Sequence, residues 1–282
     1  MGKQFLSLGF SIALSIGALP AFAGSLLYDS IPDPLPPNVP SLGYRATQTA
    51  EFGDLIQFDP GTSRGLLSVT ALMSDWAMAS TYGSPDPGWY HPLTLNLYNV
   101  DNSSGTPQPG SLIASVTQTF FIPWRPEPSP GCGTAWRAAD GNCYNGMAFG
   151  VTFNLNNLLV PDQLIYGIAF NTNTWGYKPI GAPGPYESLN FGLSTTPPTA
   201  GSNPLPDTAY WNTQTAANYT DFGAGGVGTF RQDTNWTPYS GAVTFATPEP
   251  GSIILMGCGL MLLVGICHWM SHRPLRATRR CR

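Results

Sequence analysis

Residues that could carry acid–base or nucleophilic chemistry are scarce in this chain of 282 residues. His91 is the single histidine between positions 24 and 247, and no Gly-x-Ser-x-Gly turn is present to expose a serine nucleophile. The neighbours Trp89, Tyr90 and Pro92 favour a turn residue at this position over a catalytic base. We therefore expect no Ser-His-Asp arrangement, and the chain lacks the pattern of an enzyme.

Acidic side chains keep a second chemistry open, because glycoside hydrolysis needs only two carboxylates. The acids are scattered singly over segments rich in turn residues, where solvation is their ordinary role. Glu51, Asp54 and Asp59 lie within nine residues, and calcium prefers such oxygen ligands, but there is no Asp-x-Asp-x-Asp-Gly loop. We expect no cofactor, with a structural calcium ion at these three residues as the alternative.

Aromatic residues in turn-rich segments indicate a different kind of site. Sugars bind against flat rings, while nearby polar groups fix their orientation. The candidate glycan contacts are Trp89, Tyr90, Trp124, Trp175, Tyr177, Trp211 and Trp236. The alternative is that these rings pack the interior or cap its ends, as large aromatic side chains commonly do.

Two of the five cysteines, Cys132 and Cys143, are the only pair between positions 24 and 247. In an oxidising compartment such a pair favours a disulfide. Closing a loop of this length is worth about 3 kcal/mol through chain entropy. A zinc site would need two further ligands, and His91 has no companion, so no metal site is expected.

The elements that must position these residues are short strands. Glycine (32) and proline (28) leave little room for long helices. Alternating polar and apolar residues, or β-rich runs between turn clusters, predict strands at 66–73, 93–100, 111–122, 147–155, 163–171 and 188–194. This pattern predicts one all-β domain over residues 24–247, a β-sandwich in which a jelly roll is preferred and an immunoglobulin-like sandwich comes second.

Charge excludes one class of partner. Residues 24–247 contain fifteen acidic and six basic side chains, a net charge of −9. Nucleic-acid binding requires basic patches that neutralise phosphates. We therefore expect no nucleic-acid partner.

The first 23 residues have the pattern of a secretory signal peptide. A single lysine precedes an apolar run, which ends at Ala21-Phe22-Ala23. Signal peptidase cleaves after such small-x-small sequences. The mature chain is then expected to start at Gly24, outside the cytoplasm.

Residues 248–282 form a three-part tail: Pro248-Glu249-Pro250, an apolar stretch and a basic end with five arginines. Residues 252–270 are about the minimum length for a transmembrane helix. The basic segment 271–282 is expected to stay in the cytoplasm, which directs the preceding domain outward. This tail resembles the PEP-CTERM sorting signal, whose implied partner is an exosortase that cuts near the Pro-Glu-Pro motif. An ordinary single-pass anchor is the alternative.

The region before the tail also resembles known sequences, more loosely. The segments LLYDSIPDPLPPNVPSLGYRATQTAEFGDLIQF and LTLNLYNVDNSSGTPQPGSLIASVTQTF are similar to parts of uncharacterised secreted bacterial β-sandwich domains. This resemblance implies a surface domain without an assigned activity.

Together these patterns predict an exported protein of the outer surface or extracellular matrix of a Gram-negative bacterium. The PEP-CTERM resemblance implies association with exopolysaccharide and biofilm, and the aromatic residues suggest glycan binding. Two alternatives remain open: a secreted hydrolase of polysaccharides and a purely structural surface protein.

Overall fold

The computed structural model describes residues 25–44, 49, 51–60, 64–170, 184–206, 208–212, 230–233 and 238–247. All of them belong to one compact unit, Gly24–Pro250. The predicted signal peptide, the Pro-Glu-Pro motif, the transmembrane helix and the basic tail lie outside the described residues. Within the described ranges, no helix is long and apolar enough to cross a bilayer.

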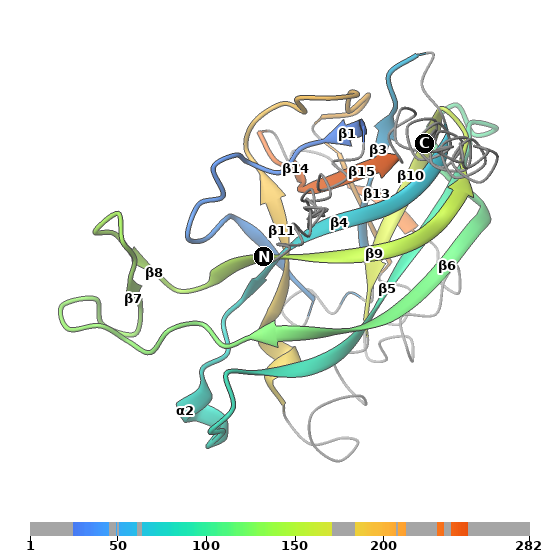
Figure 1. Ribbon diagram of the computed structural model, residues 1–282. Helices are drawn as coiled ribbons and strands as arrows, with labels where there is room; N and C mark the ends of the chain where they lie inside the picture. The colour runs from blue at the N-terminus through green and yellow to red at the C-terminus, as the bar shows by residue number, and fades with distance from the viewer. Residues whose placement is uncertain are drawn as a thin grey trace, which may run out of the picture. The chain divides into compact units, whose positions relative to one another are not determined.

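Two antiparallel sheets make up most of the fold, which confirms the all-β prediction (Figure 1). The first sheet contains β1 (Ser25–Asp29), β15 (Val243–Thr247), β4 (Gly65–Asp75), β11 (Leu189–Ser194) and β14 (Ser240–Gly241), with β2 (Ser41–Gly43) on β11 and β9 (Met147–Leu159) on β4. The second contains β13 (Phe230–Asp233), β12 (Ala209–Asn212), β3 (Glu51–Gln57), β10 (Gln163–Ala169), β5 (Gly88–Asp101) and β6 (Gln108–Pro123). The long strands β4, β9, β5 and β6 curve together as a half-barrel.

Smaller elements lie at the ends of these strands. A two-stranded hairpin of β7 (Trp136–Arg137) and β8 (Cys143–Tyr144) follows β6 in the chain. The short helix α2 (Ala79–Tyr82) connects β4 to β5, and the 3-10 helix η1 (Pro185–Ser188) precedes β11. We call residues 126–146 the arm, because this segment extends beyond the ends of β4 and β9 (Figure 1).

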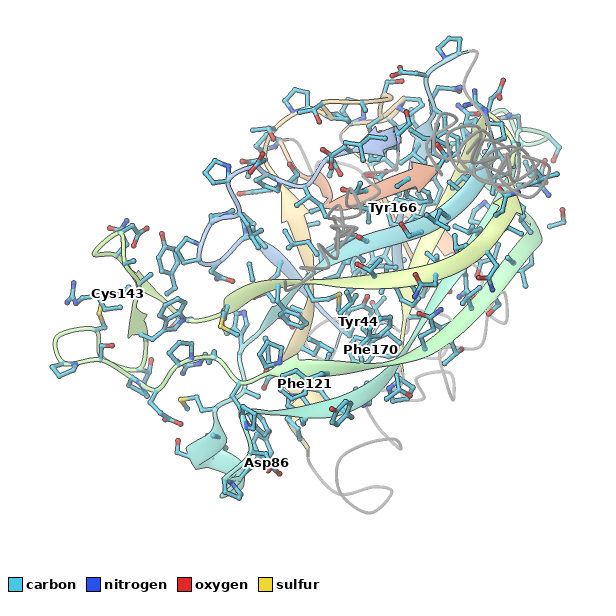
Figure 2. The ribbon with its side chains drawn as sticks, in the orientation of Figure 1. Tyr44, Asp86, Phe121, Cys143, Tyr166 and Phe170 are labelled. Atoms are coloured by element: carbon cyan, nitrogen blue, oxygen red, sulfur yellow. A yellow bond between two sulfur atoms is a disulfide. The ribbon has the colours of Figure 1, made fainter. Side chains whose placement is uncertain are left out.

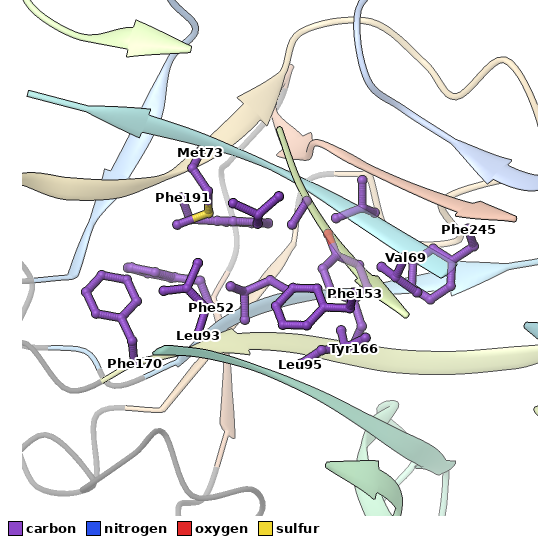
Figure 3. Close-up of a cluster of buried hydrophobic side chains, with 14 of the residues drawn as sticks. Phe52, Val69, Met73, Leu93, Leu95, Phe153, Tyr166, Phe170, Phe191 and Phe245 are labelled. Carbon is purple, nitrogen blue, oxygen red and sulfur yellow. The ribbon is translucent and has the colours of Figure 1, made fainter. Parts of the chain in front are cut away.

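The core lies between the two sheets and follows the alternation in the sequence. Leu93, Leu95 and Leu97 of β5 are fully buried in it, and Val151 and Phe153 of β9 contribute from the other sheet. Figure 3 shows Leu93, Leu95 and Phe153 in this core. Residues two apart in a strand share a face, so each strand adds every second side chain to this core. On β9 the intervening residues are exposed, as the pattern predicts.

On β5 the other face is covered as well, which the alternation does not predict. Thr94, Asn96 and Tyr98 are at most 2% exposed. Tyr98 packs with Leu55 and Tyr210 in a second, smaller apolar cluster outside the main core. Polar residues at alternate positions therefore lie here in a buried hydrogen-bonded layer and not in solvent.

Candidate carbohydrate-contact surface

Two of the predicted glycan contacts are structural. Trp89 lies in strand β5 and is 1% exposed, because its ring packs in the core beside His91. Trp124 is also buried: its ring stacks on Tyr82, and its Nε1 donates a hydrogen bond to the carbonyl oxygen of Asp86 at 3.0 Å. Trp89 therefore lies in a strand and not in a loop, whereas Trp124 directly follows the end of β6; both rings are buried at one end of the core.

Of the other predicted contacts, Trp211 and Tyr90 lie among the described residues. Trp211 of β12 stacks on Phe52 with the ring centroids 6.0 Å apart and packs against the main core. Tyr90 of β5 is 68% exposed and meets Phe121 of β6 edge to face, with 5.4 Å between ring centroids. Tyr90 thus stays available for contact with a ligand. Trp175, Tyr177 and Trp236 lie outside the described residues.

A more complete aromatic surface occurs where the arm joins the sheets, and the sequence predictions do not include it. It consists of Trp76, Trp136 and Tyr144, which we call the arm aromatic surface. Trp76 is 42% exposed, and Trp136 and Tyr144 are partly exposed, with their ring centroids 6.0 Å apart. The two tryptophans meet at Gly146: Nε1 of Trp136 donates to its carbonyl oxygen at 2.9 Å, and a Cβ atom there would overlap the indole of Trp76.

The exposed ring of Trp76 is held in one position by its neighbours. Its Nε1 donates to Oγ of Ser74 at 3.1 Å, and its backbone N–H donates to the carbonyl oxygen of Ser188 at 3.0 Å. Its own carbonyl oxygen accepts from Nε of Arg125 at 3.0 Å. An exposed side chain that is already ordered loses little conformational entropy when a ligand binds.

The arm that carries Trp136 and Tyr144 is tied by a disulfide between Cys132 and Cys143, with the Cα atoms 5.6 Å apart. Cys143 lies on the arm, away from the core (Figure 2). Nη2 of Arg125 donates to the carbonyl oxygen of Thr134 at 2.9 Å, so the arm is also anchored to the domain. The sequence contains one signal for the arm aromatic surface, because Trp136 lies inside the loop that Cys132 and Cys143 close.

Polar groups lie beside these rings. Tyr144 donates its hydroxyl hydrogen to Oδ2 of Asp140 at 2.6 Å, and the backbone N–H of Asn142 donates to Oδ1 at 2.9 Å. These bonds hold the pKa of the exposed Asp140 carboxyl below its usual range. Arg137 donates to the carbonyl oxygen of Gly141 at 2.7 Å. Flat rings beside a carboxylate and an amide are the chemistry that holds a sugar.

His91 is not the turn residue that its neighbours suggest. It lies within β5, is fully buried, and contacts the rings of Trp89 and Phe170. Its position between aromatic rings in the core separates it from solvent and from any substrate.

The three acids considered for calcium do not converge. Glu51 and Asp54 lie on opposite faces of β3, because they are three residues apart in a strand. Glu51 accepts hydrogen bonds from Asn96 and Tyr98. Asp54 accepts hydrogen bonds from Leu55, Asn203 and Gly241, so the two sets of donors have no residue in common. In the described part of the chain, no three metal-ligating side chains are grouped to hold an ion.

Among the residues whose burial the structure describes, three carboxyl groups are at most 1% exposed: Glu51, Asp54 and Asp75. Burial raises the pKa of Glu51 to about 8, of Asp54 to about 8 and of Asp75 to about 7. Asp75 accepts hydrogen bonds from the backbone of Ala77 and from Nε1 of Trp89. These groups connect strands inside the fold and do not form an exposed pair across a cleft, as a glycosidase requires.

Comparison with protein-family models, with curated proteins and with solved structures finds no match.

Proposed function

We propose that this chain is an exported protein of the bacterial surface or extracellular matrix that contacts polysaccharide through the arm aromatic surface. The observation that carries the proposal is the exposed, hydrogen-bonded indole of Trp76 beside Trp136 and Tyr144. Contiguous exposed apolar surface with a polar rim is typical of interaction sites. Its fixed orientation suits stacking against the C–H face of a sugar ring.

The ends of the sequence support the route to the surface. The signal-peptide pattern ending at Ala23 makes signal peptidase the first partner, and the Pro248-Glu249-Pro250 tail makes an exosortase the second. The apolar stretch holds the chain in the membrane before this processing. The disulfide between Cys132 and Cys143 agrees with an oxidising compartment. For the domain itself, two facing antiparallel sheets support a β-sandwich, with the jelly roll as the preferred topology.

Binding to immobilised polysaccharides tests the ligand-contact part of this proposal. On a glycan array and on exopolysaccharide from the producing cells, Trp76→Ala is expected to lower the affinity at least about tenfold, the typical cost of removing a central aromatic contact. Trp76→Phe, which keeps a ring, is expected to restore part of it. Leu159→Ala is the matched control, because Leu159 is 73% exposed at the opposite end of β9.

Equal binding by Trp76→Ala and the unchanged chain would reject the arm as the contact surface. The same series on Tyr90→Ala then shows whether the Tyr90–Phe121 pair carries the binding. Absence of binding to every glycan would leave a purely structural surface protein.

Intact-mass measurement of the secreted protein tests the sorting part separately. The expected chain starts at Gly24 and ends near Pro250, without the arginine tail. A surface protein that retains Arg282 would contradict exosortase processing and favour a permanent membrane anchor.

A further inference from the structure

A pocket of about 500 Å³ opens between the segment that follows β11 and the residues that precede β14. Residues 195–206 leave the first sheet and run along the second. On the way, Thr199 and Ala200 bond the backbone of Asp29 in β1, and Ser202 exchanges two backbone hydrogen bonds with Gln57 of β3, at 2.8 and 2.9 Å. The pocket therefore lies where one segment is fixed to both sheets. Its volume falls within the range of small-molecule sites.

A single buried carboxyl ties the two walls of this pocket together. Oδ2 of Asp54 accepts a hydrogen bond from Nδ2 of Asn203 at 2.9 Å and from the backbone N–H of Gly241 at 3.3 Å. Asn203 belongs to one wall, and Gly241 follows Ser240 of the other. The segment also approaches β3 closely at Gly201, whose φ is +68° and where an added Cβ atom would lie 2.7 Å from the carbonyl oxygen of Gln57. The walls are thus held in place before any ligand arrives.

The lining of the pocket combines proline rings with polar side chains. Its four prolines are Pro197, Pro198, Pro206 and Pro238. Asn203 and the nearly buried Ser240 supply an amide and a hydroxyl. None of the ten lining residues that the structure describes is ionisable, so these residues offer a bound ion no partner of opposite charge in exchange for its hydration.

Proline rings present C–H groups, which pack favourably on the negative face of an aromatic ring. The Ser240 hydroxyl and the Asn203 amide can exchange hydrogen bonds with a polar substituent on such a ring. We propose that this pocket binds a small, uncharged aromatic molecule that carries one hydrogen-bonding group. This site is separate from the arm aromatic surface, and its residues take no part in the proposed contact with polysaccharide.

Saturation-transfer NMR on the full-length chain tests this proposal, with phenol and indole as probes and benzoate as the charged comparison. Phenol and indole at about 1 mM are expected to receive saturation, a level that detects weak binding, and benzoate is not. Thr195→Trp, which fills the pocket from its exposed rim, is expected to lower the transfer at least tenfold. Ser103→Trp, in an exposed loop elsewhere, is the control for adding an indole.

Ser240→Ala adds a second, conservative variant, because it removes only one hydroxyl. It is expected to reduce the preference for phenol over toluene while leaving toluene binding unchanged. Three results would overturn the proposal: no transfer to phenol or indole, transfer that Thr195→Trp leaves intact, or equal transfer to benzoate. Because polysaccharide binding is measured at the arm, either proposal can fail without the other.

Discussion

The side-chain amide of Gln118 hydrogen-bonds both backbone groups of Asn154. Its Nε2 donates to the carbonyl oxygen of Asn154 at 3.1 Å, and its Oε1 accepts from the backbone N–H at 3.4 Å. Gln118 lies on β6, at the end of the strand order in one sheet, and Asn154 lies on β9, which pairs with β4 in the other sheet. On the inner side, Phe120 and Phe153 meet edge to face with their centroids 4.9 Å apart. A side chain, in place of strand pairing, thus closes this side of the half-barrel.

Gln118→Thr is expected to lower the free energy of unfolding by about 1 kcal/mol, because a typical intramolecular hydrogen bond contributes about this much net stability. It should also speed hydrogen exchange at the Asn154 amide, which loses its acceptor. Urea unfolding and native-state exchange measure both effects. Asn154→Thr is the control, because Gln118 binds only the backbone of that residue; equal losses in the two variants would refute the bridge.

Gly167→Ala is expected to destabilise the fold by about 1–3 kcal/mol, the usual cost of overpacking a buried site. A Cβ atom at Gly167 of β10 would overlap Oε1 of Glu51 and lie 2.7 Å from its Cδ. Glu51 cannot move aside without breaking its hydrogen bonds to Asn96 and Tyr98. Thermal or urea unfolding measures the loss.

Gly150→Ala serves as the matched glycine control for this variant. It lies on β9 and is exposed, and its Cβ would meet only a methyl group of Thr70 at 3.3 Å. Its free energy of unfolding is expected to change by less than about 1 kcal/mol. If Gly167→Ala were as mild as Gly150→Ala, the Glu51 side chain would have to be free to rearrange.

Stability is expected to fall as the pH rises from 5 to 8, because buried carboxyls hold protons in the folded state. Burial raises the pKa of Glu51 to about 8, whereas an unfolded glutamate titrates near its ordinary value of about 4.3. The stabilisation is fully present below the unfolded pKa and is lost as the pH rises through the folded pKa. Asp54 and Asp75 act in the same direction.

Glu51→Gln isolates the part of this dependence that Glu51 causes. Its Oε1 can still accept from Asn96 and Tyr98, but it does not titrate. Relative to the unchanged chain, the variant is expected to gain stability with rising pH, by at most about 1.4 kcal/mol per pH unit. Glu127→Gln is the control, because Glu127 is exposed and its bonds to Ser80 lower its pKa. Parallel pH curves for Glu51→Gln and the unchanged chain would contradict the assignment.

The all-β class and the main strands were predictable, because local alternation reports burial directly. All six predicted strand ranges overlap strands of the structure, with 93–100 inside β5 and 147–155 inside β9. Strands outside the predicted ranges are β1, β2, β3, β7, β8, β12, β13, β14 and β15. In β3 the carboxyls of Glu51 and Asp54 interrupt the apolar pattern, and only their distant partners Asn96 and Asn203 make their burial tolerable.

The candidate surface was harder to predict than the fold. Trp124 directly follows Pro123, and Trp89 lies two residues after Pro87, a pattern typical of loops. Both rings are nevertheless buried, where β5 begins and β6 ends. Trp76 follows the predicted strand 66–73, and its neighbours in the sequence do not indicate whether its ring is buried or exposed. The space for its indole depends on Gly146, seventy positions later in the chain, where a Cβ atom would overlap the ring; the pairing of β4 with β9 brings the two residues together.

Removal of the disulfide is expected to loosen the arm and leave the sheets intact. In Cys132→Ser/Cys143→Ser, the backbone amides of residues 129–144 lose the covalent closure that supports their turns, such as the bond from the N–H of Ala135 to the carbonyl oxygen of Cys132. Regions with few buried contacts open locally at small cost, so hydrogen exchange there should accelerate while that of β10 does not.

The same variant should bind polysaccharide more weakly, because Trp136 and Tyr144 lose their fixed positions beside Trp76. Loss of loop closure should also lower the free energy of unfolding, by up to about 3 kcal/mol. Exchange mass spectrometry and glycan binding, measured on one preparation, separate the two effects. If binding were unchanged while the amides of 129–144 exchanged faster, the rigidity of the arm would be irrelevant to recognition, and Trp76 alone would have to carry the contact.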